Sequence, residues 1–245
     1  MEFEKLNPTS YVPLYQQLKE IIIRKIERSE WKPDEKIYSE NQLFEMYDVS
    51  RNTAKKAIED LVQEGVLYRI QGKGTFVSRP KIEHSLSGFY SFSQVLKEKG
   101  LNPKDILLDV TVERASRKVA DALKLEEGEE VVLLKRLRCA DDEPIILETS
   151  YMPKSKVSQH EALNQVGDIA LYDILRNEFN IIVMSAKETF EPILIRHGEK
   201  EHLEVEVGSP ALLLERIAYD QTKTPIEYCK SIVRGDRCKF YTELI

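Results

Sequence analysis

The segment that most constrains the fold spans residues 49–77, with the sequence VSRNTAKKAIEDLVQEGVLYRIQGKGTFV. Apolar residues at helical spacing follow Ser50, and Gly65 stands where a helix commonly ends. Two short β-like runs then flank the turn Gln71-Gly72-Lys73-Gly74, which predicts a β-hairpin. A helix that runs into a glycine-rich hairpin is typical of a winged helix-turn-helix when two helices precede it.

Two such helices are predicted upstream. Apolar residues recur at helical spacing over residues 13–28, and Pro13 suits the first helical position. Ser39 and Gln42 match a capping box at the start of a second, shorter helix. Residues 1–78 are therefore predicted to form a winged helix-turn-helix domain.

A proline-containing linker is predicted at 79–88, and long strands follow it. Four helices are predicted among them, at Ser91–Lys99, Arg117–Leu123, Leu171–Phe179 and Arg196–Leu203. The six predicted strands are Ile106–Arg114, Val131–Ala140, Pro144–Met152, Ile181–Pro192, Pro210–Asp220 and Pro225–Arg234. This pattern predicts that 89–245 form an α+β domain around an antiparallel sheet.

The second domain contains a weak internal repeat. The segment ALKLEEGEEVVLLKRLRCADDEPI aligns with HLEVEVGSPALLLERIAYDQTKTPI. Three pairs of residues match in this alignment: Gly128 with Gly208, Arg136 with Arg216, and Pro144 with Pro225. Two such units would form the halves of one pseudo-symmetric sheet, unless the match reflects only the general likeness of strand–turn–strand units.

Composition excludes several classes of protein. The 245-residue chain has a formal net charge of −6 and no run of about 18 apolar residues, so no membrane-spanning helix is expected. Its N-terminus lacks the apolar core of a secretory signal. Cys139, Cys229 and Cys238 are too widely spaced to indicate a metal site or disulfide framework. We expect a cytoplasmic protein with no cofactor.

The third predicted helix carries residues suited to reading the major groove of DNA. Its apolar stripe faces the core, which leaves the polar residues of its first turns on the outer side. Arginine pairs with guanine, asparagine pairs with adenine, and threonine contacts phosphate or thymine. The predicted contacts are Arg51, Asn52, Thr53 and Lys55. The alternative for such a cationic face is simple solvation.

The hairpin tip and the second helix supply further candidates. Gly72 and Gly74 would let the backbone approach DNA closely, and Lys73 between them would enter the minor groove or meet phosphates. Ser39 is predicted as an N-cap, and a contact to a backbone phosphate is compatible with that role.

A candidate anion site lies in the second domain. Arg136 and Arg138 stand two apart on a predicted strand, so both side chains point to one face. Paired arginines chelate phosphate well, although surface salt bridges would explain them too. Ser93 belongs to the cluster Ser91-Phe92-Ser93 at the start of a predicted helix. Glu148 and Glu227 lie in apolar strands, where they would accept ligand hydroxyls or pair with arginine.

The segment PLYQQLKEIIIRKIERSEWKPDEKIYSENQLFEMYDVSRNTAKKAIEDLVQEGVLYRIQGKGTFV resembles the DNA-binding domain of GntR-family transcriptional regulators. The remainder, from SGFYSFSQVLKEKGL to SIVRGDRCKF, resembles the UTRA effector-binding domain of the HutC subfamily, which is similar to the chorismate lyase fold. The first resemblance implies DNA contacts by Ser39, Arg51, Thr53, Lys55 and Lys73. Asn41 departs from the family, which commonly has arginine there.

The second resemblance implies a sugar-phosphate site. Its phosphate-binding positions match Ser91, Phe92, Ser93, Arg136 and Arg138, and its sugar-facing carboxylates match Glu148 and Glu227. Of a further Ser-x-Tyr motif only Tyr172 matches, because Ala170 replaces the serine. Val233 and Cys238 replace two tyrosines common in the family.

Three functions follow as hypotheses. The favoured one is a homodimeric repressor that leaves a double-stranded DNA operator when it binds a small phosphorylated metabolite. A sugar phosphate such as an amino-sugar 6-phosphate is the favoured effector, and the alternative is the same DNA-binding role with a non-phosphorylated effector. The second is a lyase-like enzyme, but the sequence has no nucleophile–base or metal-spaced constellation and is predicted to have no catalytic residue. The third is an architectural DNA-binding protein without a ligand.

Overall fold

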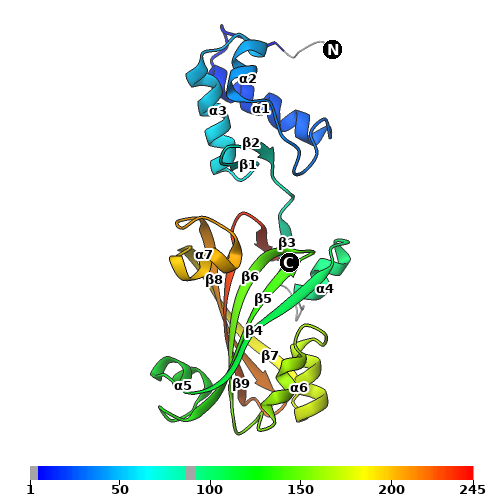
Figure 1. Cartoon of the computed structure of the whole chain (residues 1–245), viewed down its shortest axis with the longest axis vertical. Helices are drawn as coiled ribbons and strands as arrows, with labels where there is room; N and C mark the ends of the chain where they lie inside the picture. Colours follow the sequence, from blue (N-terminus) through cyan, green and yellow to red (C-terminus); the bar gives the residue numbers. More distant parts are fainter. Residues whose placement is uncertain (1–4, 87–91, 245) are drawn as a thin grey trace. The chain divides into compact units, whose positions relative to one another are not determined.

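The computed structural model describes residues 5–86 and 92–244 (Figure 1). The chain divides into two compact units, Met1–Pro80 and Lys81–Ile245. Among the described residues, no helix is long and apolar enough to cross a membrane. Within the same residues, no group of three or more His, Cys, Asp or Glu is placed to hold a metal ion.

The first unit is a winged helix-turn-helix, as predicted. Ser39 caps α2 through its hydroxyl, which accepts from the Gln42 backbone N–H, and the Gln42 side chain completes the capping box. Ser50 caps α3 by accepting from Thr53 N–H at 3.1 Å. The elements are α1 (Leu14–Glu27), α2 (Glu40–Tyr47), α3 (Arg51–Gln63), β1 (Leu67–Ile70) and β2 (Gly74–Val77).

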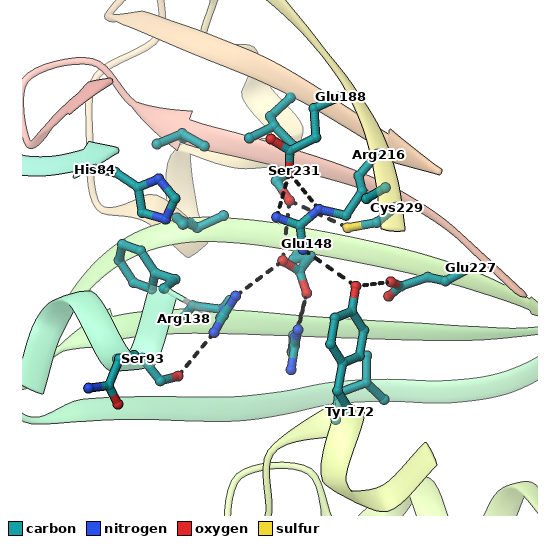
Figure 2. Close-up of a pocket in the computed structure, with 18 of the residues that line it drawn as sticks. His84, Ser93, Arg138, Glu148, Tyr172, Glu188, Arg216, Glu227, Cys229 and Ser231 are labelled. Carbon is teal, nitrogen blue, oxygen red and sulfur yellow. Dashed lines mark hydrogen bonds and ion pairs between the residues drawn. The ribbon is translucent and has the colours of Figure 1, made fainter. Parts of the chain in front are cut away.

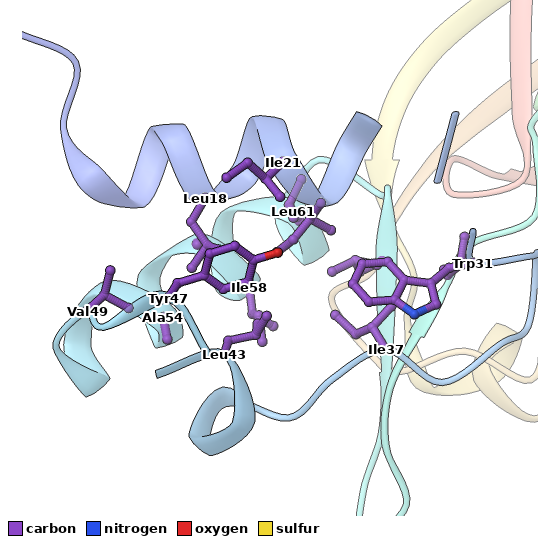
Figure 3. Close-up of a cluster of buried hydrophobic side chains, with 14 residues drawn as sticks. Leu18, Ile21, Trp31, Ile37, Leu43, Tyr47, Val49, Ala54, Ile58 and Leu61 are labelled. Carbon is purple, nitrogen blue, oxygen red and sulfur yellow. The ribbon is translucent and has the colours of Figure 1, made fainter. Parts of the chain in front are cut away.

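One apolar core holds these elements together. Figure 3 shows side chains of all three helices meeting, with Leu18 of α1 and Ile58 of α3 fully buried. Trp31 and Ile37, from the segment between α1 and α2, close the same core beside the hairpin. An isolated antiparallel bridge pairs Lys36 with Phe76 of β2, so this segment lies alongside the β-hairpin of the wing. The face of α3 opposite to this core is thereby left outside.

The second unit is built on a six-stranded antiparallel sheet in the order β4-β5-β6-β9-β8-β7. Strand bounds are β4 (Pro103–Arg114), β5 (Glu130–Ala140), β6 (Glu143–Pro153), β7 (Val183–Leu194), β8 (Pro210–Asp220) and β9 (Pro225–Arg234). The helices are α4 (Phe92–Glu98), α5 (Arg117–Leu123), α6 (Leu171–Phe179) and α7 (His197–Leu203), with a short 3-10 helix η1 (His160–Gln165).

The strand order confirms the internal repeat. Strands β4, β5 and β6 of one half correspond to β7, β8 and β9 of the other, and β6 pairs with β9 at the centre. The turns correspond as well, because Gly128 and Gly208 both have φ +86°, a left-handed conformation that favours glycine. The two halves therefore form one sheet around a pseudo-twofold axis.

Helices cover both faces of this sheet. Leu123 of α5 and Leu203 of α7 are buried on one face, in clusters that include Val131 and Leu137 of β5. On the other face α4 packs beside Ile146, and α6 packs through Leu175. Figure 1 shows the same division, with α5 and α7 on one side of the sheet and α4 and α6 on the other. Successive residues of a strand point to opposite faces of the sheet, so alternate residues pack against the two layers of helices.

The predicted linker at 79–88 is wrong in part. Residues Ile82–Ser85 form β3, which pairs in parallel with β10 (Cys238–Tyr241), and Ile82 is buried in the second unit. The boundary between units falls after Pro80. Since β3 pairs with a strand more than 150 residues away, no local pattern in the sequence could indicate it.

A buried leucine of the first unit provides a test of the two-unit organisation. We expect Leu61→Ala to lower the free energy of unfolding of the first unit by about 2–5 kcal/mol, because Leu61 is fully buried in its core. Trp31 is the only tryptophan of the chain and lies in that core, so its fluorescence reports this unit alone. The matched change Leu134→Ala in the second unit should leave the Trp31 transition in denaturant unmoved. A shift would mean that the units unfold as one.

Candidate effector pocket and DNA-binding surface

A cavity of about 640 Å³ lies in the second unit, on the sheet face that α4 and α6 cover. Strands of both halves contribute to it, with Arg136 from β5, Glu148 from β6, Arg216 from β8 and Glu227 from β9. The first turns of α4 and α6 add Ser93 and Tyr172. Figure 2 shows the labelled side chains among them, Ser93, Glu148, Tyr172, Arg216 and Glu227, converging on one site. The cavity size suits a small metabolite.

Two buried arginines and two carboxylates form the first half of the site. Arg136 donates to Glu148 Oε1 at 2.6 Å and to Asp105 Oδ2 at 3.0 Å. Arg138 makes longer contacts, 3.2 Å to Asp105 Oδ1 and 3.5 Å to Glu148 Oε2. Arg138 also donates to Ser93 Oγ at 3.1 Å and lies over the Phe92 ring. The predicted pair is thus brought together, but Arg138 is held less tightly than Arg136.

Glu148 is the carboxylate at the centre of this network. It lies on the inner strand β6, directly opposite Arg136 in the sheet register, and is 5% exposed. Burial alone would raise the pKa of Glu148, but the charges of the pocket arginines outweigh burial and lower that pKa to about 2. Ser231 donates to its second oxygen. Glu148 therefore remains ionised and shared between Arg136 and Arg138.

The second half of the site is arranged around Tyr172. Its hydroxyl donates to Glu227 Oε2 at 2.8 Å and lies 3.4 Å from Arg216. Ser150 donates to the other oxygen of Glu227 at 2.7 Å, while Arg216 pairs with Glu188 at 2.6 Å. Burial and the Glu227 charge raise the pKa of Tyr172 well above its ordinary value, so its hydroxyl stays protonated.

Seven of the eight residues predicted from the sequence to bind an effector lie in the described part of the chain, and all seven line this cavity. They are Phe92, Ser93, Arg136, Arg138, Glu148, Tyr172 and Glu227. The eighth, Ser91, lies outside the described residues. Sequence reasoning missed Asp105, Glu188, Arg216 and His84 as lining residues. The repeat alignment of Arg136 with Arg216 was the one available signal, whereas the others depend on strand register.

The first unit presents the predicted DNA-binding residues on α3. Arg51, Asn52 and Lys55 are exposed, opposite the buried face of the helix. The Arg51 guanidinium lies over the Phe44 ring, 5.5 Å from its centroid, which orients it from α2. Thr53 is half-buried, and its hydroxyl lies 2.8 Å from that of Ser50, so it takes part in the helix cap.

The hairpin tip is exposed at Gly72 and Lys73. Gly74 has φ +128°, a backbone conformation that L side chains rarely adopt, so the backbone requires glycine there; the atoms that a Cβ would meet belong to the flexible end of the Lys36 side chain. Lys and Arg balance Asp and Glu in residues 1–80, with thirteen of each, so the acidic excess of −6 falls on 81–245. Overall acidity is therefore no obstacle to a DNA-binding first unit.

A winged helix-turn-helix joined to a domain with a charged, metabolite-sized cavity defines the class of ligand-responsive DNA-binding regulators. Family comparison gives the particular assignment. Residues 14–77 match the bacterial regulatory proteins of the gntR family, and residues 98–239 match the UTRA domain. The chain belongs to the GntR family of transcription regulators with a UTRA domain, and this family consists of regulators rather than enzymes.

Individual relatives agree with this assignment over nearly the whole chain. It is 34% identical to the HTH-type transcriptional repressor NagR of Bacillus subtilis, over 96% of both chains. It is 30% identical to the probable fructoselysine utilization operon transcriptional repressor of Escherichia coli K12, over 93% of both. The crystal structure of PhnF from Mycobacterium smegmatis superposes with a TM-score of 0.64 at 27% identity, covering 93% of this chain and 98% of PhnF.

The buried network predicts how the second unit responds to acid. Glu148→Gln should lower the free energy of unfolding at pH 7 by about 3–5 kcal/mol, because it leaves two buried arginines under-compensated. The folded-state pKa of Glu148 is lowered, so its contribution is present above pH 4.5 and is lost as the pH falls toward 2.

The stability gap between the native protein and the Gln variant should therefore narrow over that interval. Denaturant titrations followed by circular dichroism at several pH values measure it, with Glu113→Gln on the exposed side of β4 as the matched control. A gap that stays constant from pH 7 to pH 2 would contradict the assigned role of Glu148.

Proposed function

We propose that this regulator is a cytoplasmic homodimer that represses transcription from a double-stranded DNA operator and is released by a small phosphorylated metabolite. An amino-sugar 6-phosphate is the favoured effector. The observation that carries the proposal is the mixed charge of the cavity, which offers the paired arginines Arg136 and Arg138 in one half and Glu227, hydrogen-bonded to neutral donors, in the other. A ligand with both an anionic and a cationic or hydroxyl-rich part complements it.

Arg138 is the proposed anchor for the phosphate. All three pocket arginines already form ion pairs, so an incoming anion must replace or share their partners. The contacts of Arg138 to carboxylates are the longest of the three, at 3.2 and 3.5 Å, and are therefore the easiest to exchange. Ser93 beside it supplies a hydroxyl. Arg136, held by short contacts, keeps Glu148 in place.

Glu227 is the proposed partner for the amine or hydroxyl groups. Its hydrogen bonds among the described residues come from Ser150 and Tyr172, which carry no charge. The described cavity lining contains four carboxylates and three guanidinium groups, so a purely anionic ligand would leave excess negative charge. One relative is named for fructoselysine utilization, and fructoselysine is itself a sugar joined to an amine.

A homodimer is proposed because a helix-turn-helix reads operators as two half-sites, one for each subunit. The second unit has the surface for such an association. Its edge strand β7 leaves Met184 and Leu194 exposed by 63% and 61%. An edge strand with exposed apolar side chains is suited to pairing with a second copy.

The proposed operator contacts divide into two kinds. Arg51, Asn52, Thr53 and Lys55 would face the major groove, with Arg51 reading a base edge. Ser39, at the start of α2, and the tip Gly72-Lys73-Gly74 would position the domain on the DNA backbone or minor groove. The exposure of α3 and of the hairpin tip supports this division.

Operator binding tests this division directly. Arg51→Ala should weaken binding to the operator by about 1–3 kcal/mol and relax specificity at one base pair. Lys73→Ala should weaken binding to all sequences and reduce the slope of log affinity against log salt by about 1. Fluorescence anisotropy over a salt series measures both, and sedimentation gives two chains per operator. Arg24→Ala on α1 is the matched control; equal effects of all three changes would refute the division.

Thermal-shift measurements test the effector. Glucosamine 6-phosphate at 100 times its dissociation constant should stabilise the second unit by about 2.7 kcal/mol. Arg138→Gln should abolish this shift and leave operator affinity unchanged, whereas Arg114→Gln, at an exposed position of β4, should retain it. Glucosamine and inorganic phosphate serve as separate probes. Equal stabilisation by unphosphorylated glucosamine would favour a non-phosphorylated effector instead.

A further inference from the structure

His84 lines the cavity from an element that sequence reasoning assigned to the linker. It lies on β3, and its neighbours in the site include Arg138 and Glu188. Figure 2 shows its ring extending from β3 toward the charged cluster, on the same side as Arg138. Across the β3–β10 pairing it faces Phe240, and the two rings lie 5.5 Å apart. The strand and this ring contact hold His84 at the edge of the cavity.

The imidazole of His84 has unused hydrogen-bonding capacity. Its Nδ1 is buried and has no hydrogen-bond partner among the described residues. Burial lowers the pKa of His84, and of the charged groups that face it, Arg216 and Arg138 lower it further while Glu188 opposes them. At neutral pH the ring is therefore uncharged, with one donor and one acceptor. A buried polar atom without a partner destabilises the empty site, and a hydrogen bond to a ligand hydroxyl or phosphate oxygen would remove that cost.

The strand that carries His84 is the first element after the DNA-binding unit. That unit ends at Pro80, and only Lys81 separates it from β3. The strand is held to the second unit by four register pairs with β10. Ile82 N also donates to Arg237 O at 2.7 Å, and Leu86 N, just after β3, donates to Tyr241 O at 2.8 Å. A two-stranded pairing of this length is marginal by itself. Contacts made by His84 therefore bear on how firmly the start of the second unit is held.

We propose that His84 contacts the bound effector and couples occupancy of the cavity to operator affinity through β3. This inference rests on the proposed effector-release function. The ligand binds more tightly when β3 is seated on β10, and that seating restricts the chain that leads to the DNA-binding unit. Arg138 binds the ligand whether or not β3 is seated on β10. His84 contacts the ligand only when β3 is seated, and this difference in ligand affinity between the two states is what release from the operator requires.

Two substitutions separate this role from simple packing. His84→Phe keeps a ring against Phe240 and removes both nitrogens, and His84→Gln restores a donor and an acceptor. Glu83→Gln is the matched control, because Glu83 lies on the opposite face of the same strand and pairs at the surface with Lys239. Each variant is measured as the full-length protein, for operator affinity by fluorescence anisotropy with and without saturating glucosamine 6-phosphate.

The native protein and Glu83→Gln should lose operator affinity by roughly 5–150-fold when the probe is added. In His84→Phe this factor should fall to less than about threefold, with unchanged operator affinity in the absence of probe and with probe binding still detectable by calorimetry. His84→Gln should recover most of the factor. If His84→Phe loses as much operator affinity as the native protein when the probe is added, the proposed role of His84 is wrong, while the proposed effector release still stands.

The proposed function fails in a different way. If neither glucosamine 6-phosphate nor inorganic phosphate changes the operator affinity or the stability of the native protein, the phosphorylated effector is wrong, and the role of His84 falls with it. NMR tests the contact between His84 and the ligand directly. The imidazole resonances of His84 should shift on addition of the probe, while those of exposed His197 should not.

Discussion

The ion pairs around Glu148 are the interaction on which the second unit depends. Glu148 lies on an inner strand, where a lone carboxylate would be expensive, and Arg136 and Arg138 compensate it from the neighbouring strand. Asp105 then compensates the remaining charge of both arginines from β4. A cavity lined by charges could not otherwise be placed on the face of a sheet that elsewhere packs apolar helices. The network keeps this half of the cavity polar and pairs each of its four charges.

Pseudo-symmetry explains how one cavity presents two different ends. The repeat places Arg216 where the first half has Arg136, yet Ala218 stands at the position of Arg138, and Cys229 faces Arg216 in the position of Glu148. The second half thus has one arginine instead of two, and its acidic partner comes from Glu188 on the edge strand. The repeated strands form the frame of the cavity, and the differences between matching positions make its two halves unlike.

The fold was largely predictable because its signals are local. Capping residues, helical spacing and the glycine turn identified the first unit, and alternation identified the long strands. The arginine pair could be assigned to one face because Arg136 and Arg138 are two apart on a strand. Asp105 and Glu188 could not be assigned, since their places opposite Arg138 and Arg216 depend on cross-strand register and a bulge in β4. The pairing of β3 with β10 joins the two ends of the second unit, so no local pattern in the sequence indicates it.

The sequence by itself determined the two-domain plan, the helix predicted to bind DNA, the glycine hairpin and the pair of arginines that line one face of the cavity. Each of these follows from the spacing of residue types along a helix or strand. Only the tertiary structure decided how the buried charges pair, that Arg138 is held less tightly than Arg136, and that His84 belongs to the cavity. These properties depend on which strands lie side by side and in what register, and distances between side chains far apart in sequence are set by packing of the whole domain.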